Sequence, residues 1–267
     1  MGIPRKVVIR GAGDLATGVA HRLWNSGFSV VMLELPRPLV VRRTVSFATA
    51  VYDGYIEVEG IRAELCPSAG KVGEYLDRRV IPVLVDRKAD ALASLQPPVV
   101  VDAIMAKKDT STRLDFAELV IGLGPGFTAG REVHAVVETK RGHNLGRVIY
   151  SGSAEKDTSE PGLIEGYGKE RLLRAPADGI FKPLKKIGDL VKAGDTVAAV
   201  GDLKINSEIN GLVRGMLYTG SEVFRGLKVG DIDPRGSAVD YYRISDKARS
   251  VGGGVLEAIL SRYFKNV

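Results

Sequence analysis

The sequence has little cysteine, few aromatic residues and no long apolar run. Cys66 is the single cysteine among 267 residues, which excludes an internal disulfide and suits a reducing compartment. Aromatic residues make up 6% of the chain, whereas glycine occurs 32 times, and this balance favours many tight turns over a large aromatic core. No window comes near the roughly 18 uninterrupted apolar residues of a membrane-spanning helix. A strand pattern begins already at Val7, so we expect no signal peptide, a cytoplasmic location and no membrane contact.

The charge also lacks the pattern of a nucleic-acid-binding protein. The net charge is +6, which by itself would suit an acidic partner. The basic residues, however, come in scattered pairs without interleaved aromatic residues: Arg5-Lys6, Arg42-Arg43, Arg78-Arg79, Lys107-Lys108 and Lys185-Lys186. Such pairs are usual on solvated faces. We therefore expect no nucleic-acid partner, and a small anionic ligand would gain more from this positive charge.

The amino-terminal residues have the pattern of a dinucleotide-binding turn. A β-branched run, Val7–Ile9, precedes the motif Gly-x-Gly-x-x-Ala that Gly11, Gly13 and Ala16 form. An apolar helix stripe follows, and a second strand closes on Glu34. In such a turn the first glycine permits a tight bend, the second lets backbone approach a pyrophosphate, and the small third residue lets helix pack on strand. Glu34 stands about 20 residues on, where a carboxylate holds ribose hydroxyls, which predicts bound NAD(P) or another nucleotide.

Asp14 is the feature against a diphosphate in this turn, because its carboxylate would repel the phosphates. Its alternative roles are to cap the helix or to meet a cation or the substrate, and a Rossmann-like unit that has lost its ligand is the alternative for the whole segment. Strands and helices alternate up to residue 123, which predicts a mostly parallel sheet. Ligands bind at the carboxyl ends of the strands in such sheets. Asp102, Lys107 and the loop with Gly124 and Gly126 are therefore expected at the same rim as the glycine motif.

Residues 127–157 hold the densest group of polar side chains. Val133–Thr139 is predicted to be a strand with His134 and Glu138 on one face, followed by a hairpin turn with Arg141 and His143. We predict that these four side chains line the reactive or anionic end of the site, for proton transfer or anion recognition. The alternative is a polar hairpin whose histidines satisfy backbone carbonyls. Neither a Cys pair nor a His-Glu-x-x-His motif indicates zinc, and we predict no metal site.

A repeat with an offset of 32 residues runs through the last third of the chain. It aligns like residues with like: Gly179 with Gly211, Gly188 with Gly220, Val191 with Val223, Gly194 with Gly226, Val197 with Val229 and Val200 with Ile232. The match predicts two copies of one supersecondary unit, which must fold together because neither can bury its apolar face alone.

The repeat region, with Ala175–Gly179, Gly188-Asp189 and Gly194-Asp195, resembles the biotinyl/lipoyl barrel-sandwich hybrid. In that family a lysine at the hairpin in the middle of the module carries the cofactor, and Lys204 falls near that place. Its neighbours are not methionines, and the best turn dipeptide, Gly201-Asp202, comes two residues early. We therefore predict that Lys204 carries no biotinyl or lipoyl group and is a surface lysine.

The predicted fold class is α/β. We expect a Rossmann-like, mostly parallel sheet domain over residues 1–165, with the polar hairpin inside it. An all-β barrel-sandwich hybrid module follows over residues 170–236, and a C-terminal helical segment over residues 237–267 packs on the first domain.

Four motifs together carry a family resemblance. They are Ile9–Gly18, Gly122–Gly130, Glu138–Arg147 and Gly230–Arg235. Together they resemble the accessory proteins of selenium-dependent molybdenum hydroxylases, the YqeB type, over nearly the whole chain. The resemblance implies a bacterial cytoplasmic protein that helps mature or supply a molybdenum hydroxylase, by handling its labile selenium or its molybdopterin cofactor. It also implies the hydroxylase or its maturation machinery as partner.

Three functions are then open. The leading hypothesis is a maturation factor that binds a nucleotide, or the nucleotide end of a molybdopterin-type cofactor, at Gly11, Gly13 and Ala16, with Glu34 on the ribose. The second is an NAD(P)-dependent oxidoreductase, for which His134 is the candidate proton donor. The third is a non-enzymatic scaffold whose repeat region docks onto the hydroxylase. Whether a reaction is catalysed, and whether the chain forms a homo-oligomer, the sequence leaves open.

Overall fold

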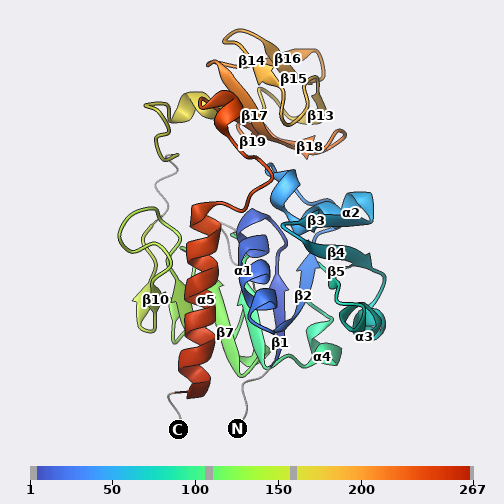
Figure 1. The fold of residues 1–267 in the computed structure, drawn as a ribbon, viewed down its shortest axis with the longest axis vertical. Coiled ribbons are helices and arrows are strands. Elements are labelled where there is room, and N and C mark those ends of the chain that lie inside the picture. Colours follow the sequence, from blue (N-terminus) through green and yellow to red (C-terminus); the bar gives the residue numbers. More distant parts are fainter. Residues whose placement is uncertain (1–4, 106–110, 157–160, 265–267) are drawn as a thin grey trace. The chain divides into compact units, whose positions relative to one another are not determined.

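The computed structural model describes residues 5–105, 111–156 and 161–264, which form two compact units (Figure 1). Of the described residues, unit 1 comprises 5–38, 46–156 and 244–264, and unit 2 comprises 39–45 and 161–243. The amino-terminal, middle and carboxyl-terminal parts of the chain thus all contribute to unit 1.

Unit 1 contains a nine-stranded sheet and a separate pair of short strands. The strands are β1 (Lys6–Arg10), β2 (Ser29–Glu34), β3 (Tyr55–Val58), β4 (Ile61–Cys66), β5 (Ile81–Val85), β6 (Val99–Asp102), β7 (Leu119–Leu123), β8 (Thr128–Ala129), β9 (Ala135–Val137), β10 (Val148–Ile149) and β11 (Gly152–Ser153). The order in the large sheet is β10-β9-β7-β6-β1-β2-β5-β4-β3, and β11 pairs with β8. The inner pairs are parallel, whereas the edge pairs β9–β10 and β3–β4 are antiparallel.

The helices of unit 1 differ widely in length. They are α1 (Asp14–Asn25), α2 (Ala50–Asp53), α3 (Val72–Asp77), α4 (Leu92–Leu95) and α5 (Asp246–Phe264), with 3-10 turns η2 (Phe47–Thr49), η3 (Ala69–Lys71) and η4 (Leu114–Phe116). Figure 1 shows α1 and α5 side by side along the same face of the sheet. The opposite face packs Val8, Val100, Val120 and Val136 against apolar side chains of α3 and α4. Because both faces are covered, the central strands are apolar between their ends.

Small residues let α1 and α5 approach closely. A Cβ atom added to Gly18 would lie 2.6 Å from the Cβ of Ala248, and one added to Gly252 would lie 2.8 Å from the carbonyl oxygen of Gly18. A Cβ on Gly254 would lie 2.1 Å from the carbonyl oxygen of Gly146, in the loop between β9 and β10. The glycine run in α5 therefore serves backbone-to-backbone packing, because no larger residue fits at Gly252 or Gly254 without displacement.

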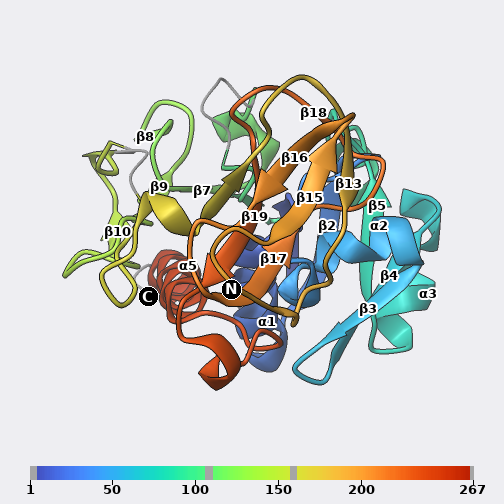
Figure 2. The ribbon, with the colours of Figure 1, turned by 90° about the horizontal axis from the view of Figure 1, so that it is seen from above.

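Unit 2 consists of two four-stranded antiparallel sheets. Its strands are β12 (Leu172–Arg174), β13 (Gly179–Pro183), β14 (Leu190–Val191), β15 (Thr196–Val200), β16 (Leu203–Asn206), β17 (Gly211–Met216), β18 (Glu222–Val223) and β19 (Lys228–Asp233), with η1 (Arg43–Val45), η5 (Lys169–Arg171) and η6 (Gly236–Ala238). One sheet has the order β12-β19-β17-β14 and the other β16-β15-β13-β18. Figure 2 shows β13, β15 and β16 as neighbouring strands. Phe181, Val213, Met216 and Ile232 lie between the sheets without solvent exposure.

The 32-residue offset has a counterpart in the pairing of these strands. In the first copy β13 pairs with β15, and in the second β17 pairs with β19. The copies also exchange strands, because β13 pairs with β18 of the second copy and β17 pairs with β14 of the first. Gly179 is thus in register with Val223, and Gly211 with Val191. Each copy therefore completes a sheet that the other begins.

The predicted fold class is wrong. In place of a Rossmann-like, mostly parallel sheet domain followed by a barrel-sandwich hybrid module, the chain forms a nine-stranded mixed sheet and several antiparallel sheets. The hairpin β3–β4, with its turn at Glu59 and Gly60, adds an antiparallel edge that alternation of strands and helices does not predict. Unit 2 also takes residues 39–45 and everything described from 161 to 243, and only α5 returns to unit 1.

In the part of the chain that the structure describes, no helix combines the length and the apolar character needed to cross a membrane.

Candidate functional site

The glycine loop after β1 lies at the carboxyl end of the sheet, where the order of the strands reverses. β1 has β2 on one side and β6 on the other. The strands that follow β2 and those that follow β6 therefore extend the sheet in opposite directions from β1. Gly11 has a φ of +94°, and a Cβ added to it would lie 3.0 Å from the carbonyl oxygen of Ala103. Its N–H donates to the carbonyl of Leu33 at 2.7 Å. Only glycine fits this crossing without strain.

Gly13 and Ala16 place the start of α1 against the loop. Gly13 is the N-cap of α1, with an extended conformation of φ −66° and ψ −176°, and no side chain caps the helix. Ala16 is 1% exposed and faces the packed side of the helix. Because any residue can adopt the backbone angles of Gly13, a glycine is not needed there for conformational freedom.

Asp14 is the first residue of α1 and does not cap it. A carboxylate in the first turn interacts favourably with the helix dipole. It would also compete with a phosphate for the same N–H groups, so the objection to a diphosphate at this loop stands.

Glu34, the last residue of β2, is bonded to the glycine loop. Its Oε2 accepts a hydrogen bond from the N–H of Ala12 at 2.7 Å, and its Oε1 accepts one from the N–H of Leu35 at 2.7 Å. Burial raises the pKa of Glu34 above its ordinary value, although the hydrogen bonds from Leu35 and Ala12 act in the opposite direction. The carboxylate is therefore at the rim, and each oxygen keeps a lone pair for a further donor.

Asp102, at the end of β6, is buried in an ion pair. It has no solvent exposure and lies 3.1 Å from Nη1 of Arg10, the last residue of β1. The hydroxyl of Thr112 contacts both side chains, and Oδ1 of Asp102 accepts the N–H of Ile104 at 3.0 Å. Asp102 thus holds the backbone at Ile104, directly after β6, in place. Arg10 and Thr112 were not identified from the sequence as partners of Asp102. A charged residue at the end of a β-branched run, such as Arg10, is the signal that indicates a buried ion pair.

Gly124 and Gly126 also lie at the carboxyl end, in the loop after β7. Their φ values are +71° and +109°, a region that favours glycine. A Cβ on Gly124 would lie 2.5 Å from Oγ1 of Thr139, and its N–H donates to the carbonyl of Val137 at 2.8 Å. The loop is therefore packed against the end of β9. Lys107, expected at this rim, lies outside the described residues.

His134 and Glu138 do not share a site, because they flank β9 at opposite ends. His134 precedes the strand, where its N–H donates to the carbonyl of Val120 at 2.8 Å and its Nδ1 accepts the N–H of Val120 at 3.0 Å. Burial, and then the charge of Arg262, lower the pKa of His134. His134 is therefore at the amino end of β7 and β9, away from the glycine loop by the length of the strands.

Glu138 holds backbone in place at the carboxyl end of β9. It is 2% exposed. Its Oε1 accepts the N–H groups of Thr139 and Lys140 at 2.7 and 2.8 Å, and its Oε2 accepts the N–H of Glu155 at 2.8 Å. A buried carboxylate that accepts from three backbone N–H groups ties two loops together. This arrangement suits a structural anchor better than a general base.

Arg141 and His143 lie in the exposed loop that follows. Both η nitrogens of Arg141 contact the carboxylate of Asp246, at 2.6 and 2.9 Å. The bidentate pair connects the loop to the first residue of α5. His143 is exposed. The four residues predicted at the reactive end thus occupy three separate places.

A cavity of about 380 Å³ lies beside this loop. Glu138 and Glu155 line it together with Asn144, Arg147 and Tyr150. A second cavity, of about 420 Å³, includes Cys66. Cys66 itself is 2% exposed, and burial raises the pKa of its thiol, so it is a poor nucleophile.

Lys204 lies within β16, opposite Ala199, and is exposed. The turn before it is at Gly201, where φ is +57°. Over the described residues, no three His, Cys, Asp or Glu side chains come together in a way that would hold a metal ion.

The chain is similar to one bacterial protein over almost its whole length. It is 53% identical over 254 residues to "Uncharacterized protein YqeB" of Escherichia coli K12. The match covers 95% of this chain and 47% of YqeB. The chain thus spans about half the length of the curated relative that it matches. No family model matches the chain. The similarity supports the YqeB part of the resemblance in sequence, and it brings no activity with it.

Solved structures resemble the chain only weakly. An aspartoacylase family protein from Mesorhizobium loti has a TM-score of 0.23 at 12% identity, covering 79% of this chain and 58% of that one. A succinylglutamate desuccinylase/aspartoacylase from Rhodobacter sphaeroides has 0.28 at 12%, covering 86% of each. An NAD-dependent epimerase/dehydratase described as putative, from Methylobacillus flagellatus, has 0.26 at 18%, covering 51% and 41%.

Proposed function

We propose that this chain binds a nucleotide, or the nucleotide end of a molybdopterin-type cofactor, at the loop between β1 and α1. The observation that carries the proposal is the loop itself. Gly11 crosses the ends of β2 and β6 in a conformation that only glycine adopts freely, and α1 then begins at Asp14, after the N-cap Gly13, without a side-chain cap.

The chemistry of the loop suits a phosphate next to a ribose. The first turn of α1 offers backbone N–H donors and the positive end of the helix dipole to an anion. Oε2 of Glu34 accepts the N–H of Ala12 in the loop, and in dinucleotide-binding folds a carboxylate about 20 residues after the glycine motif accepts ribose hydroxyls. NAD(P) is the nucleotide class that fits both groups. Asp14 adds a requirement, since its carboxylate must turn away or meet a cation when a phosphate binds.

We further propose that binding serves the maturation of a selenium-dependent molybdenum hydroxylase in a bacterial cytoplasm. The support for this step is in the sequence: the motifs Gly122–Gly130 and Gly230–Arg235 and the similarity to YqeB. The partner would be the hydroxylase or its maturation machinery.

Equilibrium dialysis tests the binding step, with NAD(H), NADP(H), ATP and molybdopterin nucleotides as ligands. Gly13→Leu is the informative variant, because φ −66° suits leucine while its side chain adds bulk at the N-cap of α1, where the phosphate is proposed to bind. We expect at least about a 10-fold loss of affinity, the effect of about 1.4 kcal/mol. Gly253→Ala is the control, since its Cβ meets nothing within 4 Å. The proposal fails if no nucleotide binds, or if Gly13→Leu binds as the unaltered chain does.

The oxidoreductase alternative gains no support from the geometry. A dehydrogenase needs a proton donor beside the nicotinamide, and His134 lies at the amino end of the strands.

A docking role for unit 2 has one observation in its favour. Ile180 in β13 and Phe224, directly after β18, are 54% and 58% exposed, and β13 pairs with β18. Exposed apolar side chains in one place are typical of a protein-binding surface. Ile180→Asp with Phe224→Asp should abolish capture of the hydroxylase in a pull-down while nucleotide affinity is kept. Unchanged capture would exclude this face.

A further inference from the structure

An amide separates a cation from a carboxylate in the cavity beside β10. Arg147 and Glu155 both line this space of about 380 Å³, and so does Asn144. Oδ1 of Asn144 accepts from Nη1 of Arg147, and its Nδ2 donates to Oε1 of Glu155, each at 3.4 Å. Both hydrogen bonds are long for N–H donors and oxygen acceptors. A ligand with better-placed groups can therefore replace Asn144 at either charged side chain.

Glu138 holds the backbone that carries these two side chains. Its N–H donates to the carbonyl of Arg147 at 3.0 Å, and Oε2 of its carboxylate accepts the N–H of Glu155 at 2.8 Å. The residue after Arg147, Val148, is in register with Val137 in the pairing of β10 with β9. The spacing of the two charged residues is thus set by the fold. Groups that are positioned before a ligand arrives lose less entropy when it binds.

The two charged side chains keep hydrogen-bonding capacity for a ligand. Over the described residues, the guanidinium of Arg147 has Asn144 as its one hydrogen-bond partner, so most of its five N–H donors are available. Glu155 accepts from Nζ of Lys140 through Oε2 at 2.6 Å, which leaves lone pairs on Oε1. Glu138, in contrast, already accepts from three backbone N–H groups. The cavity therefore offers donors to an anionic group and an acceptor to a cationic one.

Part of the cavity is apolar. Val148 and Ile149, the two residues of β10, line it and are half-buried, and Tyr150 beside them is 52% exposed. A volume of about 380 Å³ is within the range of small-molecule sites. An apolar group of moderate size can therefore lie next to the charged side chains.

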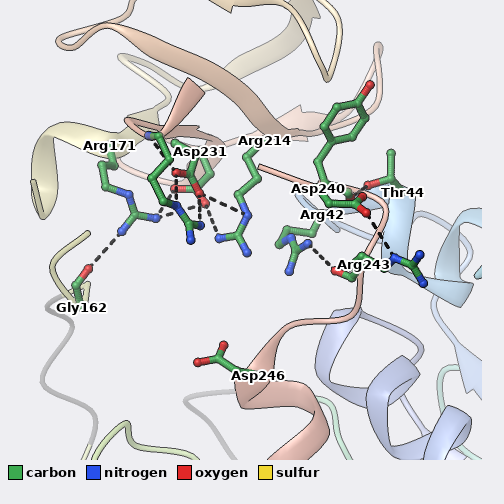
Figure 3. Close-up of polar contacts among 12 residues, drawn as sticks. Arg42, Thr44, Gly162, Arg171, Arg214, Asp231, Asp240, Arg243 and Asp246 are labelled. Carbon is green, nitrogen blue, oxygen red and sulfur yellow. Dashed lines mark hydrogen bonds and ion pairs between the residues drawn. The ribbon is translucent and has the colours of Figure 1, made fainter. Parts of the chain in front are cut away.

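Charged side chains in unit 2 are arranged differently, because they pair directly. In the charged cluster around Asp231, Nη2 of Arg171 donates to this buried carboxylate at 3.1 Å, and Nη1 of Arg214 lies 3.8 Å from it. Figure 3 shows these two arginines approaching Asp231 from opposite sides. Arg147 and Glu155 are exposed and have an amide between them. Opposite charges that are held apart beside a cavity suit a ligand that carries both charges.

We propose that this cavity binds a small zwitterion, an α-amino acid with an apolar side chain. Its carboxylate binds Arg147, because a guanidinium donates two parallel hydrogen bonds that match carboxylate oxygens. Its ammonium group binds Glu155, and its side chain lies against the apolar residues of β10. A simple anion such as phosphate would gain nothing from Glu155 and would be repelled by it. The site is separate from the glycine loop, since β6 and β7 lie between β1 and β9 in the sheet.

Isothermal titration calorimetry of the full chain tests the proposal, with L-leucine, L-isoleucine and L-phenylalanine as ligands. We expect at least one of them to bind. The tightest is then compared with its analogues that lack the amino group or the carboxylate, for leucine 4-methylpentanoate and 3-methylbutylamine. Each analogue loses one charged contact, so each should bind at least about 10-fold more weakly.

Variants of the two charged residues test the site itself. Arg147→Gln and Glu155→Gln should each weaken binding of the amino acid at least about 10-fold. Arg131→Gln is the control, because Arg131 pairs with Glu132 outside the residues that line the cavity, and it should leave the affinity unchanged. Arg147→Gln should also keep the nucleotide affinity in equilibrium dialysis, which separates this proposal from the nucleotide site.

Circular dichroism establishes that each variant is folded, and Glu155→Gln carries the test if Arg147→Gln is not. The proposal is overturned if none of the three amino acids binds, or if the analogue without the amino group binds as tightly as the amino acid. It is also overturned if folded Arg147→Gln or Glu155→Gln binds as tightly as Arg131→Gln. Binding of inorganic phosphate that Arg147→Gln abolishes and Glu155→Gln strengthens would indicate a simple anion site and would equally contradict it.

Discussion

Replacing Gly254 by alanine should destabilise unit 1, although alanine is the better helix former. In a helix interior the exchange of glycine for alanine is worth about 1 kcal/mol in favour of folding. The new Cβ, however, would lie 2.1 Å from the carbonyl oxygen of Gly146 and 2.8 Å from Cγ1 of Val137. Overpacking costs about 1–3 kcal/mol, and a clash with backbone belongs at the upper end. The net loss should be about 2 kcal/mol.

Gly253→Ala provides the matched control one residue away in the same helix. Its Cβ meets nothing within 4 Å, so only the gain in helix propensity remains, about 1 kcal/mol. The two variants should therefore differ by about 3 kcal/mol in the free energy of unfolding. This corresponds to a difference of roughly 6–12 °C in the thermal unfolding midpoint for a domain of this size. Trp24 is the single tryptophan and lies in α1, so its fluorescence follows the unfolding of unit 1 in urea.

The reasoning is refuted if Gly254→Ala is as stable as Gly253→Ala. The displaced loop also carries Glu138, whose carbonyl accepts the N–H of Gly146 at 2.9 Å. A destabilised Gly254→Ala should accordingly show faster amide hydrogen exchange at Gly146, whereas Gly253→Ala should not.

Three other predictions concern the hairpin region. Because burial lowers the folded-state pKa of His134, the unfolded chain binds the proton more readily, and stability should fall as the pH drops below 6.5. His134→Asn should reduce the change of the urea unfolding midpoint with pH between about pH 5 and 7. An unchanged dependence of the midpoint on pH would contradict this. Glu138→Ala leaves three backbone N–H groups without their acceptor and should lower the free energy of unfolding in urea by at least about 3 kcal/mol. The control Glu155→Ala removes an exposed side chain. A similar loss of stability in this control would refute the role of Glu138 as a structural anchor. Arg141→Ala should leave nucleotide affinity unchanged in equilibrium dialysis, because its guanidinium binds Asp246; a clear loss would return Arg141 to the site.

The sequence predicted many single elements of unit 1 well. The alternation of strands and helices expected up to residue 123 ends with β7, and the C-terminal helical segment expected over residues 237–267 contains α5. Buried parallel strands are apolar on both faces, which makes them easy to find in a sequence. Tyr55–Val58 and Ile61–Cys66 were missed, although the Glu59-Gly60 turn between two alternating runs is a hairpin signal.

The arrangement of the predicted site was less accessible. The alternating pattern placed His134 and Glu138 on one face of a strand. The strand β9, however, comprises only Ala135–Val137, and each residue of β9 is buried. A strand covered on both faces has no polar side, so the two polar residues fall beyond its ends. The charged cluster around Asp231 requires side chains that are distant in sequence and a bulge at Arg214, and neither can be inferred from local pattern.

The exchange of strands between the two copies in unit 2 has a consequence for synthesis on the ribosome. β13 pairs with β18, so the first copy cannot complete its sheet before residues 222–223 have been made. At about 5–20 residues per second, this delay lasts a few seconds. During it Phe181, which ends without solvent exposure, has no cover from the second copy. The nascent chain therefore presents an open strand edge to other molecules, and the exposure ends only when the second copy has left the ribosome.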